Sequence, residues 1–467
     1  MLTAKWYRDF GSDALASYSM STGGTVDTSK PLPPGNFGLP FIGETLPFVK
    51  DTSTFLQERF QRFGPIFKTR LFGDPVVCFG GHEAFSFFMD DRYFTRRDSS
   101  PKHIRELLNP DALPFIHDAQ HTKRKRLILQ AFKPTALDTY LPALERVIGR
   151  FIEKWAKLGS FQWVPELEAM SFALADTLFA GADPDVDNVE AAAQFGRFVD
   201  GMLALPLNLP FTTFGRSLKA RDQLLSYVDR TIATHRKNPP VDLLAQLMSA
   251  RDDAGESLSD FEIKIELLHF YFAAHSALYS ALSYHLMLLG KHPDAMDRAR
   301  AEVATEAADG PFTMEVVGRL PYVHQVCLES RRHAGVVPLT FFGTVRETFE
   351  YQGHHVPKGW KAFALIASTM RDAKTFTNPT QYDPDRFGPG RAEHQRHANA
   401  YVAQGGGAED SHRCAGEHLA NLIMTVFTAR ILRSYTWELP AQDFGPRLGR
   451  LSPTPMDGLK VIFRQSV

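Results

Sequence analysis

The sequence predicts a mostly α-helical protein with a small β portion. Helical periodicity dominates from about residue 100 to residue 300, and short strand-like runs come before and after this stretch. The 467 residues are 44% hydrophobic and 22% charged, a mix that can fill the core of a globular fold. With 52 basic and 53 acidic residues the net charge is −1. This balance excludes a general nucleic-acid binder, which needs a basic excess.

The N-terminal region has a polar stretch followed by an apolar, turn-rich one. Residues 1–30 lack the apolar core of a signal peptide or anchor, so we expect a flexible leader there. Residues 31–46 (PLPPGNFGLPFIGETL) are rich in Pro and Gly yet hydrophobic, which indicates a segment docked on the fold. No internal repeat or long linker divides the rest of the chain. Residues 31–467 are therefore predicted to form a single domain.

The next elements are two short strands and then a series of helices. The strands, IFKTRLF and PVVCFG, flank the turn signal Gly73-Asp74. Segments such as ALERVIGRFIEKWAKL and RDQLLSYVDRTIATHR carry the apolar stripe of a helix. The run from Phe270 to Gly290 has no formal charge and is about as long as a membrane span. Its histidines and serines favour a long buried helix, with no transmembrane segment.

The pattern changes after about residue 335. TFEYQGHHVPKGW is typical of a β-hairpin, and residues 377–412 are rich in Pro, Gly and Asp without clear periodicity. A last helix is predicted over about 416–434, and short strands over the final 30 residues. These strands and the two near the start of the chain make up the small β portion that the sequence predicts.

One of the three cysteines has a distinctive setting. Cys78, Cys327 and Cys414 are too few for a disulfide framework and favour a reducing, cytoplasmic location. Cys414 follows a glycine-rich stretch in QGGGAEDSHRCAGEHLA and precedes a predicted helix. Backbone N–H groups near a helix N-terminus stabilise a thiolate, and such a thiolate is a good axial ligand for haem iron. Taken alone, the pattern fits a buried cysteine near a helix start equally well.

Two further motifs favour the haem ligand. Glu329 and Arg332 are spaced i, i+3 in CLESRRH and can pair on one helix face, and YDPDRF adds Arg386. With the Cys-x-Gly loop, these motifs occur in the order typical of the cytochrome P-450 superfamily, which the chain resembles. PPGNFGLPFIGETL, HTKRKRLILQAF and HSALYSALSYHLMLLGKHP resemble that family's proline-rich segment, C helix and I helix. FGPIFKTRLFG, LILQAF…LDTYLP and HVPKGW are most similar to a cyanobacterial branch related to retinoic-acid hydroxylases.

The resemblance implies a cytochrome P-450 fold in which haem b lies between the I helix and the cysteine-ligand loop with its L helix. Cys414 would be the proximal thiolate ligand, and a structural triad of Glu329, Arg332 and Arg386 would hold the cysteine loop. Basic side chains would pair with the two haem propionates, because buried carboxylates need compensating charge. The resemblance assigns that role to His121 with the adjacent Arg124 or Lys125, to Arg346 and to His412.

The I helix departs from the family pattern. Ordinary members carry an acid followed by threonine, which steer protons to dioxygen, but the register here places Ser276 and Ala277 at those positions. Alanine has no exchangeable proton and serine is not an acid, so neither can supply the usual relay. His275, one residue earlier, is a candidate proton donor, and the alternative is a histidine that packs among the helices. Ser276, Ala277 and His275 are the catalytic candidates.

The cysteine loop departs from the common pattern as well. Three glycines come first, and a spacer with the sequence AEDS separates them from His412. This arrangement resembles bacterial fatty-acid peroxygenases, which use hydrogen peroxide and also lack the acid–threonine pair. Those enzymes carry an Arg-Pro pair in the I helix that holds the substrate carboxylate. No arginine or proline occurs from 270 to 290, which argues against fatty-acid peroxygenation.

The sequence thus predicts a haem-thiolate oxidoreductase that acts on an apolar small molecule, by C–H hydroxylation or a related oxidation. Three mechanisms stay open: reductive oxygen activation with ferredoxin and ferredoxin reductase, a peroxygenase reaction with hydrogen peroxide, and a non-oxygenating rearrangement or dehydration. A catalytically silent haem-binding protein is the remaining alternative. An apolar pocket favours a lipid-, terpenoid- or polyketide-like substrate, as in secondary metabolism. The predicted pocket residues are Phe115, Phe211, Phe272, Leu278, Val337, Phe341 and Phe342.

Overall fold

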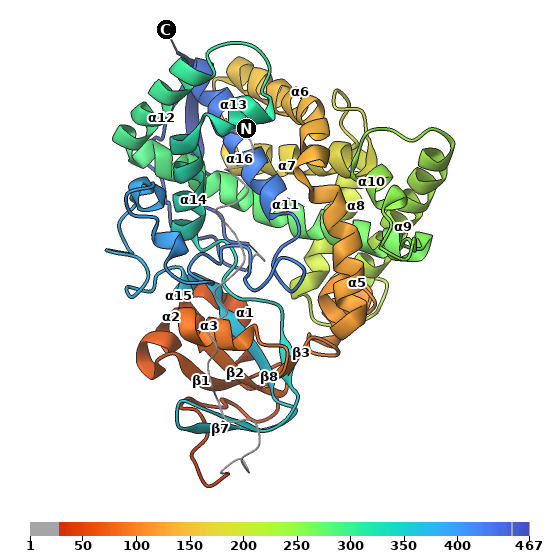
Figure 1. Cartoon of the computed structure of the whole chain (residues 1–467), viewed down its shortest axis with the longest axis vertical. Coiled ribbons are helices and arrows are strands. Elements are labelled where there is room, and N and C mark those ends of the chain that lie inside the picture. The colour runs from red at the N-terminus through yellow and green to blue at the C-terminus, as the bar shows by residue number, and fades with distance from the viewer. Residues whose placement is uncertain (1–27, 450–451, 467) are drawn as a thin grey trace.

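The computed structural model describes residues 28–449 and 452–466. Helices make up the larger part of the molecule, and a five-stranded sheet lies at the end away from most of the helices (Figure 1). This arrangement confirms the predicted fold class, mostly helical with a small β portion. Of the leader expected over residues 1–30, residues 1–27 lie outside the described part of the chain.

The helices occupy most of the chain between Thr45 and Ser434. The α-helices of the described residues are α1 (Thr45–Lys50), α2 (Thr52–Phe63), α3 (His82–Phe88), α4 (Lys102–Leu108), α5 (Asp118–Leu129), α6 (Pro134–Leu158), α7 (Trp163–Ala180), α8 (Val189–Asp200), α9 (Thr213–Lys237), α10 (Leu243–Ser249), α11 (Asp260–Lys291), α12 (Pro293–Glu306), α13 (Met314–Gly318), α14 (Pro321–Ala334), α15 (Ile366–Thr369) and α16 (Glu417–Ser434). Short 3₁₀ turns join several of them: η1 (Leu113–Phe115), η2 (Gln130–Phe132), η3 (Gly201–Leu203), η4 (Pro384–Phe387) and η5 (Glu393–Gln395).

The strands of the described residues form three separate sheets. They are β1 (Ile66–Leu71), β2 (Asp74–Gly80), β3 (Phe94–Thr95), β4 (Ser160–Gln162), β5 (Gly343–Val345), β6 (Phe349–Tyr351), β7 (His354–Val356), β8 (Lys361–Leu365), β9 (Tyr435–Glu438) and β10 (Lys460–Gln465). The largest sheet has the order β1-β2-β8-β5-β3, the second has the order β4-β10-β9, and β6 pairs with β7 as the predicted hairpin. Strands β1 and β2 pair antiparallel, whereas β2 and β8 pair parallel.

Both faces of the large sheet are covered. Along β2, Val77 and Phe79 pack on one face with the buried side chains of α3. Val76 and Cys78 alternate with them and pack on the other face with the buried side chains of α1 and α2. The third and largest hydrophobic cluster lies among the helices and includes α6, α7, α11 and α16. The continuous apolar run PVVCFG is thus explained by a strand buried on both faces.

Helix α11 is the long buried helix that the sequence predicts around 270–290. It begins ten residues earlier than that run, at Asp260, because Ser259 and Glu262 form a reciprocal capping box at its N-terminus. Nearly all of its C-terminal half is buried, and α7, α9 and α14 pack against it. Among the described residues, no helix is both long and apolar enough to cross a bilayer.

Candidate active site

Cys414 lies at the end of an irregular loop, three residues before α16 begins at Glu417. The Cys414 backbone N–H donates a hydrogen bond to the carbonyl oxygen of Gln404 at 3.2 Å, which closes the loop on itself. Gly405 has a φ of 87°, a conformation that other residues adopt only at a cost. A Cβ atom at Gly406 would lie 2.4 Å from Asn399 Oδ1. The glycines before the cysteine are therefore required by the path of the loop.

The Cys414 side chain is accessible within this loop, whereas Cys78 and Cys327 are buried. Burial nevertheless raises the pKa of the Cys414 thiol, and the positive charge of Lys125 opposes that rise. A thiol that is both accessible and surrounded by protein atoms faces an enclosed space rather than bulk solvent. Cys414 is thus the one described cysteine that an incoming group can reach.

A second accessible position lies in the middle of α11. Ala273 is exposed, although the neighbouring Tyr271 and His275 are buried. Phe132 links this helix to the cysteine loop. Its ring centroid lies 5.9 Å from that of Phe270, and its Cε1 would lie 3.6 Å from a Cβ at Gly416. Helix α11 and the cysteine loop therefore flank the same region of the protein.

Several basic side chains gather at one edge of this region. The rings of His121 and His412 have centroids 4.4 Å apart, and His117 stacks on His412 at 5.6 Å with an interplanar angle of 5°. Burial lowers the pKa of His121 to about 3 and that of His412 to about 4, while the Asp91 carboxylate, 3.2 Å from His412 Nε2, opposes the fall for His412. Two carboxylates placed here would raise the pKa values of His121 and His412. Their negative charge would stabilise the protonated rings and offset the repulsion between them.

Arg96 and His117 both present buried donors without a hydrogen-bond partner. The Arg96 backbone N–H donates to His117 Nδ1 at 3.3 Å, so the proton of the neutral ring must sit on Nε2. Both His117 Nε2 and Arg96 Nη1 are buried donors, and neither has a hydrogen-bond partner among the described residues. Burial lowers the pKa of Arg96 to about 10. A protonated Nε2 is a donor rather than a metal ligand, which favours an incoming carboxylate over a metal ion bound by Asp91, His117 and His412.

The residues of this region therefore fit a haem. Cys414 offers an accessible thiol at a helix N-terminus, which is the ligand that haem iron accepts from a protein loop. Arg96 Nη1 and His117 Nε2 offer buried donors without a hydrogen-bond partner for propionate oxygens, although the Asp118 carboxylate lies 3.5 Å from His117 Nε2. His121 and His412, assigned to the propionates from the sequence, lie in the same cluster.

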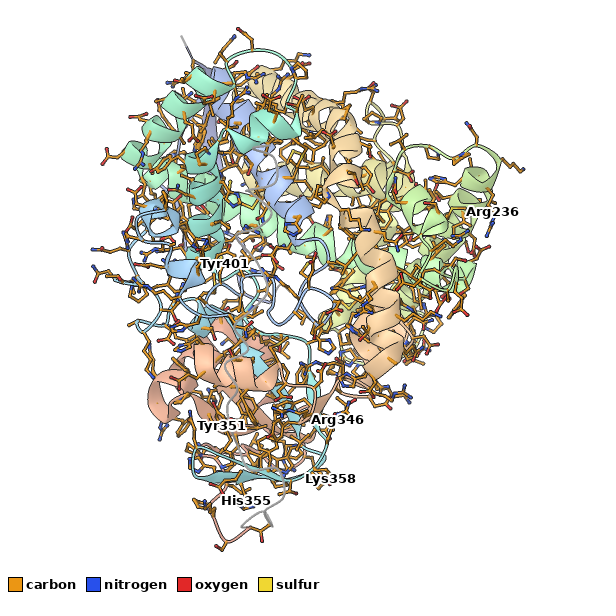
Figure 2. All side chains as sticks on the ribbon, viewed as in Figure 1. Arg236, Arg346, Tyr351, His355, Lys358 and Tyr401 are labelled. Carbon is orange, nitrogen blue, oxygen red and sulfur yellow. The ribbon has the colours of Figure 1, made fainter. Side chains whose placement is uncertain are left out.

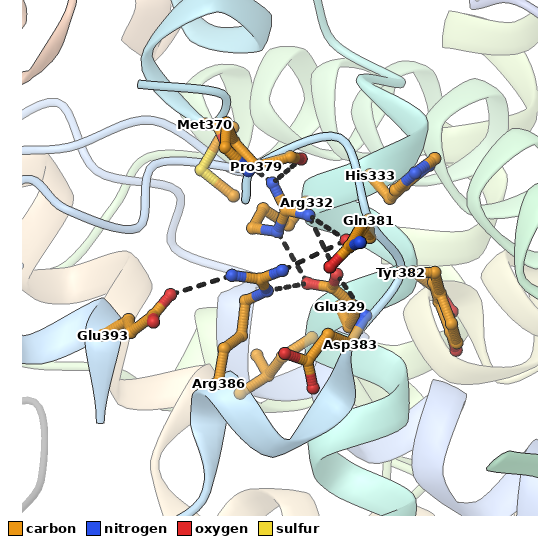
Figure 3. A network of polar contacts seen from close by, with 12 residues as sticks. Glu329, Arg332, His333, Met370, Pro379, Gln381, Tyr382, Asp383, Arg386 and Glu393 are labelled. Atoms are coloured by element: carbon orange, nitrogen blue, oxygen red, sulfur yellow. Dashed lines mark hydrogen bonds and ion pairs between the residues drawn. The ribbon is translucent and has the colours of Figure 1, made fainter. Parts of the chain in front are cut away.

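Glu329, Arg332 and Arg386 meet in a fully buried ion-pair network (Figure 3). Arg332 Nε and Nη2 donate to the two carboxylate oxygens of Glu329 at 2.6 and 2.8 Å. Arg386 Nε lies 3.1 Å from Glu329 Oε2. The remaining N–H groups of Arg332 donate to the backbone carbonyls of Met370, Pro379 and Gln381, so all five donors are satisfied. Helix α14 is thereby joined to the irregular segment that leads to the cysteine loop.

A second carboxylate in this network was not foreseen from the sequence. Glu393 Oε2 accepts a hydrogen bond from Arg386 Nη1 at 2.8 Å and is itself buried (Figure 3). Arg391 Nη2 also donates to Glu393, at 2.9 Å. The pKa of Glu393 is lowered by these arginines in spite of its burial. Glu393 lies in a stretch without periodicity, so only its spacing of seven residues from Arg386 could have suggested the contact.

Two of the side chains predicted to face the propionates have other partners. Arg124 Nη2 donates to Glu262 at 2.7 Å and Nη1 to Glu266 at 3.2 Å, so its guanidinium faces α11 and the prediction is wrong. Lys125 Nζ donates to the backbone carbonyl of Arg413, so it holds the cysteine loop instead. Arg124 and Lys125 are adjacent in α5 and point about 100° apart, which separates these two side chains from each other.

Arg346 lies where the large sheet approaches the start of α5 (Figure 2). Its Nη2 donates to Asp118 at 2.6 Å and its Nε to the carbonyl oxygen of Phe94 at 3.2 Å. Its charge lowers the pKa of His117, a smaller effect than that of burial. Arg346 is therefore at the rim of the basic cluster, where a propionate would have to compete with Asp118.

The structure contradicts the assignment of His275 as a proton donor at this site. Its ring packs against Phe195 of α8 at 4.8 Å, Phe172 of α7 at 6.4 Å and Tyr279 at 5.2 Å. Burial lowers its pKa to about 4. His275 follows the accessible Ala273 by two positions, so its side chain points about 160° away from that of Ala273 around the helix. Ser276 is buried and Ala277 partly exposed, on the same side of the helix as Ala273.

The predicted pocket residues divide into two groups. Phe115 is buried with its ring 6.0 Å from that of Phe341, and Phe272 and Val337 are partly exposed beside the helical core, so these four stay predicted pocket residues. Three predictions are wrong. Leu278 lies about 140° around α11 from Ala273 and packs in the helical core. Phe342 packs on Phe363 in the sheet. Phe211 is 74% exposed in the loop before α9.

The sequence contains one signal for the missed donors. His117 precedes His121 by four residues, and a pair spaced i, i+4 across a helix start lies on one face. Arg96 has no such signal, because its place beside His117 depends on the pairing of β3 with β5.

Replacing Arg96 should have opposite effects on the haem-free and the haem-bound protein. Arg96→Met removes a buried charge that has no ion-pair partner among the described residues, so the haem-free chain should melt at a higher temperature. The same change removes a charge-assisted hydrogen bond of ~1.5–3 kcal/mol and should weaken haem binding roughly tenfold or more. Haem titration and thermal melting measure both effects, and Arg97→Met, the exposed neighbour, is the matched control. A fall in both quantities would show that Arg96 is purely structural.

Comparison with known proteins places this geometry in a family. The family model described as Cytochrome P450 matches residues 33–460. The chain is 36% identical to cytochrome P450 120 of Synechocystis sp., an alignment covering 95% of this chain and 99% of that protein. It is 30% identical to cytochrome P450 26A1 of Gallus gallus, over 89% of this chain and 88% of that protein.

A solved structure agrees with the sequence relatives. Retinoic acid-bound cyanobacterial CYP120A1 superposes with a TM-score of 0.86 at 35% identity, covering 94% of this chain and all of that chain. Members of this family bind haem, which agrees with the accessible thiol and the unpaired donors described above. The chain therefore belongs to the cytochrome P450 family.

Proposed function

We propose that this protein binds haem b through Cys414 and hydroxylates a C–H bond of an apolar small molecule, with hydrogen peroxide as the better oxidant. Bound haem would supply the chemistry that transfers one oxygen atom to the substrate. The observation that carries the choice of oxidant is the pair Ser276 and Ala277 beside the accessible Ala273. At these positions neither side chain is an acid, so the usual relay of an acid and an alcohol is missing.

The two oxidants place different demands on the protein. Reductive turnover converts R–H, O₂, two electrons and two protons into R–OH and water, so two protons must come through the protein. Peroxide turnover converts R–H and H₂O₂ into R–OH and H₂O and needs only one proton moved from one peroxide oxygen to the other. A missing acid–alcohol pair therefore harms the reductive route, with its ferredoxin and ferredoxin reductase, more than the peroxide route.

The aromatic side chains predicted to line the pocket support an apolar substrate. Phe115 and Phe341 form an edge-to-face pair, and Phe272 adds a partly exposed ring from α11 itself. Such rings exclude water and hold an apolar molecule by contact rather than by charge. The solved relative with retinoic acid bound makes all-trans-retinoic acid a reasonable first probe for this chain.

Turnover of retinoic acid should be faster with hydrogen peroxide than with NADPH, ferredoxin and ferredoxin reductase. The double variant Ser276→Glu, Ala277→Thr should reverse this preference, because it rebuilds the acid–alcohol pair, and a general acid contributes roughly 100-fold or more. Product formation by mass spectrometry and NADPH consumed per product are the measurements. Tightly coupled NADPH-dependent hydroxylation by the unmodified protein would contradict the choice of oxidant. Product formed without either oxidant would instead establish a rearrangement or dehydration.

A further inference from the structure

The N-terminal half of α11 carries ionisable side chains along the face that ends at Ala273. Glu262, Glu266, His269 and Ala273 are spaced by four, three and four residues, which places them on one side of a helix. Glu262 is partly exposed, Glu266 is fully buried and His269 is almost buried. This face therefore leads from solvent through a buried acid and a histidine to the accessible position on α11.

Glu266 is a buried carboxylate with a complete set of partners. Its Oε1 accepts hydrogen bonds from the backbone N–H of Leu113 at 2.8 Å and from Arg124 Nη1 at 3.2 Å. Its Oε2 faces His269 Nδ1 at 3.2 Å. The carboxylate is thus held in place by α5 and by the turn η1, and it turns one oxygen toward the histidine.

The orientation of His269 follows from this contact. A carboxylate accepts but does not donate, so the Nδ1 atom of His269 carries its proton toward Glu266. In the neutral ring Nε2 is then the nitrogen with a lone pair, which can take up a proton and give it back. His269 precedes Ala273 by four residues, one turn of helix, or about 6 Å of rise. The Leu113 contact also places Glu266, the partner of His269, beside η1, which includes the pocket residue Phe115.

Building on the function proposed above, we propose that His269, positioned by Glu266 and Arg124, moves the proton when hydrogen peroxide is used. His269 Nε2 takes the proton from one peroxide oxygen and returns it to the other as the O–O bond breaks, so that the latter leaves as water. The oxygen that lost the proton goes into the substrate C–H bond, and His269 ends the cycle as it began. Glu266 and Arg124 are positioning residues in this scheme, because they act through His269.

The test compares two histidines of the same helix. His269→Gln keeps a polar side chain that can still donate to Glu266, so the fold and the haem should be retained. His275→Gln is the matched control, because His275 is equally buried in α11 but faces α7 and α8. We expect His269→Gln to lower kcat with peroxide by roughly 100-fold with an unchanged retinoic acid KM, and His275→Gln to leave both unchanged. Glu266→Gln, which keeps the Leu113 hydrogen bond, should lower kcat in the same direction.

Binding of potassium cyanide to the ferric protein gives a readout that does not depend on turnover. Hydrogen cyanide binds as the anion, so a nearby base must take up its proton and donate it back as a hydrogen bond. The dissociation constant, measured from the shift of the Soret band, should rise roughly tenfold in His269→Gln and stay constant in His275→Gln. A role limited to joining α5 and α11 would lower the melting temperature but leave cyanide affinity unchanged.

The outcomes separate this inference from the proposed function. If haem-loaded His269→Gln matches the unmodified protein in cyanide affinity and in peroxide turnover, the role of His269 is overturned and the proposed function stands. If the unmodified protein, loaded with haem, gives no product with peroxide, both the role of His269 and the choice of oxidant are overturned. If it shows no thiolate-type haem spectrum at all, the whole proposed function fails.

Discussion

Replacing Cys414 with alanine should abolish the thiolate-type spectrum of the haem-loaded protein. Cys414 is accessible at the start of α16, and no other described cysteine can reach the same place, because Cys78 is buried in the sheet and Cys327 in the helical core. Burial raises the pKa of Cys327 to about 11, so its thiol stays protonated and is a poor ligand. The measurement is the reduced carbon-monoxide difference spectrum.

The other two cysteines supply the controls for this experiment. Cys78→Ala and Cys327→Ala each remove a buried sulfur and should cost some stability while leaving the thiolate Soret band in place. If Cys414→Ala retains the band and either control loses it, the ligand has been assigned to the wrong residue. Loss of the band in Cys414→Ala alone is the expected result.

Glu329→Ala should cause the largest loss of stability among the changes considered. Glu329 is fully buried, and its carboxylate neutralises Arg332 and Arg386, which are fully buried as well. Removing one partner of a buried ion pair costs ~3–5 kcal/mol, against a typical total stability of ~5–15 kcal/mol for a folded protein. The variant should therefore melt at a much lower temperature and bind less haem. Thermal unfolding and haem content are the measurements.

Glu315→Ala is the control for the charge change. Glu315 pairs with Arg319 at 2.9 Å on the surface of α13, where water already solvates both groups. Its removal should leave the melting temperature almost unchanged. Glu329→Gln should fall between the two, since the amide keeps acceptors for the arginines but not the charge. A Glu329→Ala variant with normal melting and full haem content would refute the structural role of the network.

Local sequence patterns determined several elements of this protein: an ion pair within one helix, the long buried helix, and the glycine-rich cysteine loop with the helix that follows it. The Glu329–Arg332 pair is a property of one helix turn, and the long buried helix was apparent from its apolar run, so both could be predicted without tertiary information. The glycines before Cys414 and the helix after it likewise follow from short stretches of chain. The family resemblance rests on these same local motifs, so the sequence alone is enough to recognise it.

Tertiary structure alone decided which way the functional side chains face. Arg124 and Lys125 are neighbours in sequence, yet one joins Glu262 and Glu266 of α11 and the other reaches the cysteine loop, because α5 packs between the two. His275 packs against α7 and α8 because of the rotation of α11 about its own axis, which periodicity does not determine in a helix buried on nearly every side. Arg96 and Glu266 meet partners 21 and 153 residues away along the chain. Contacts of this kind depend on how whole helices and strands pack together, so the spacing of residues along the sequence does not predict them.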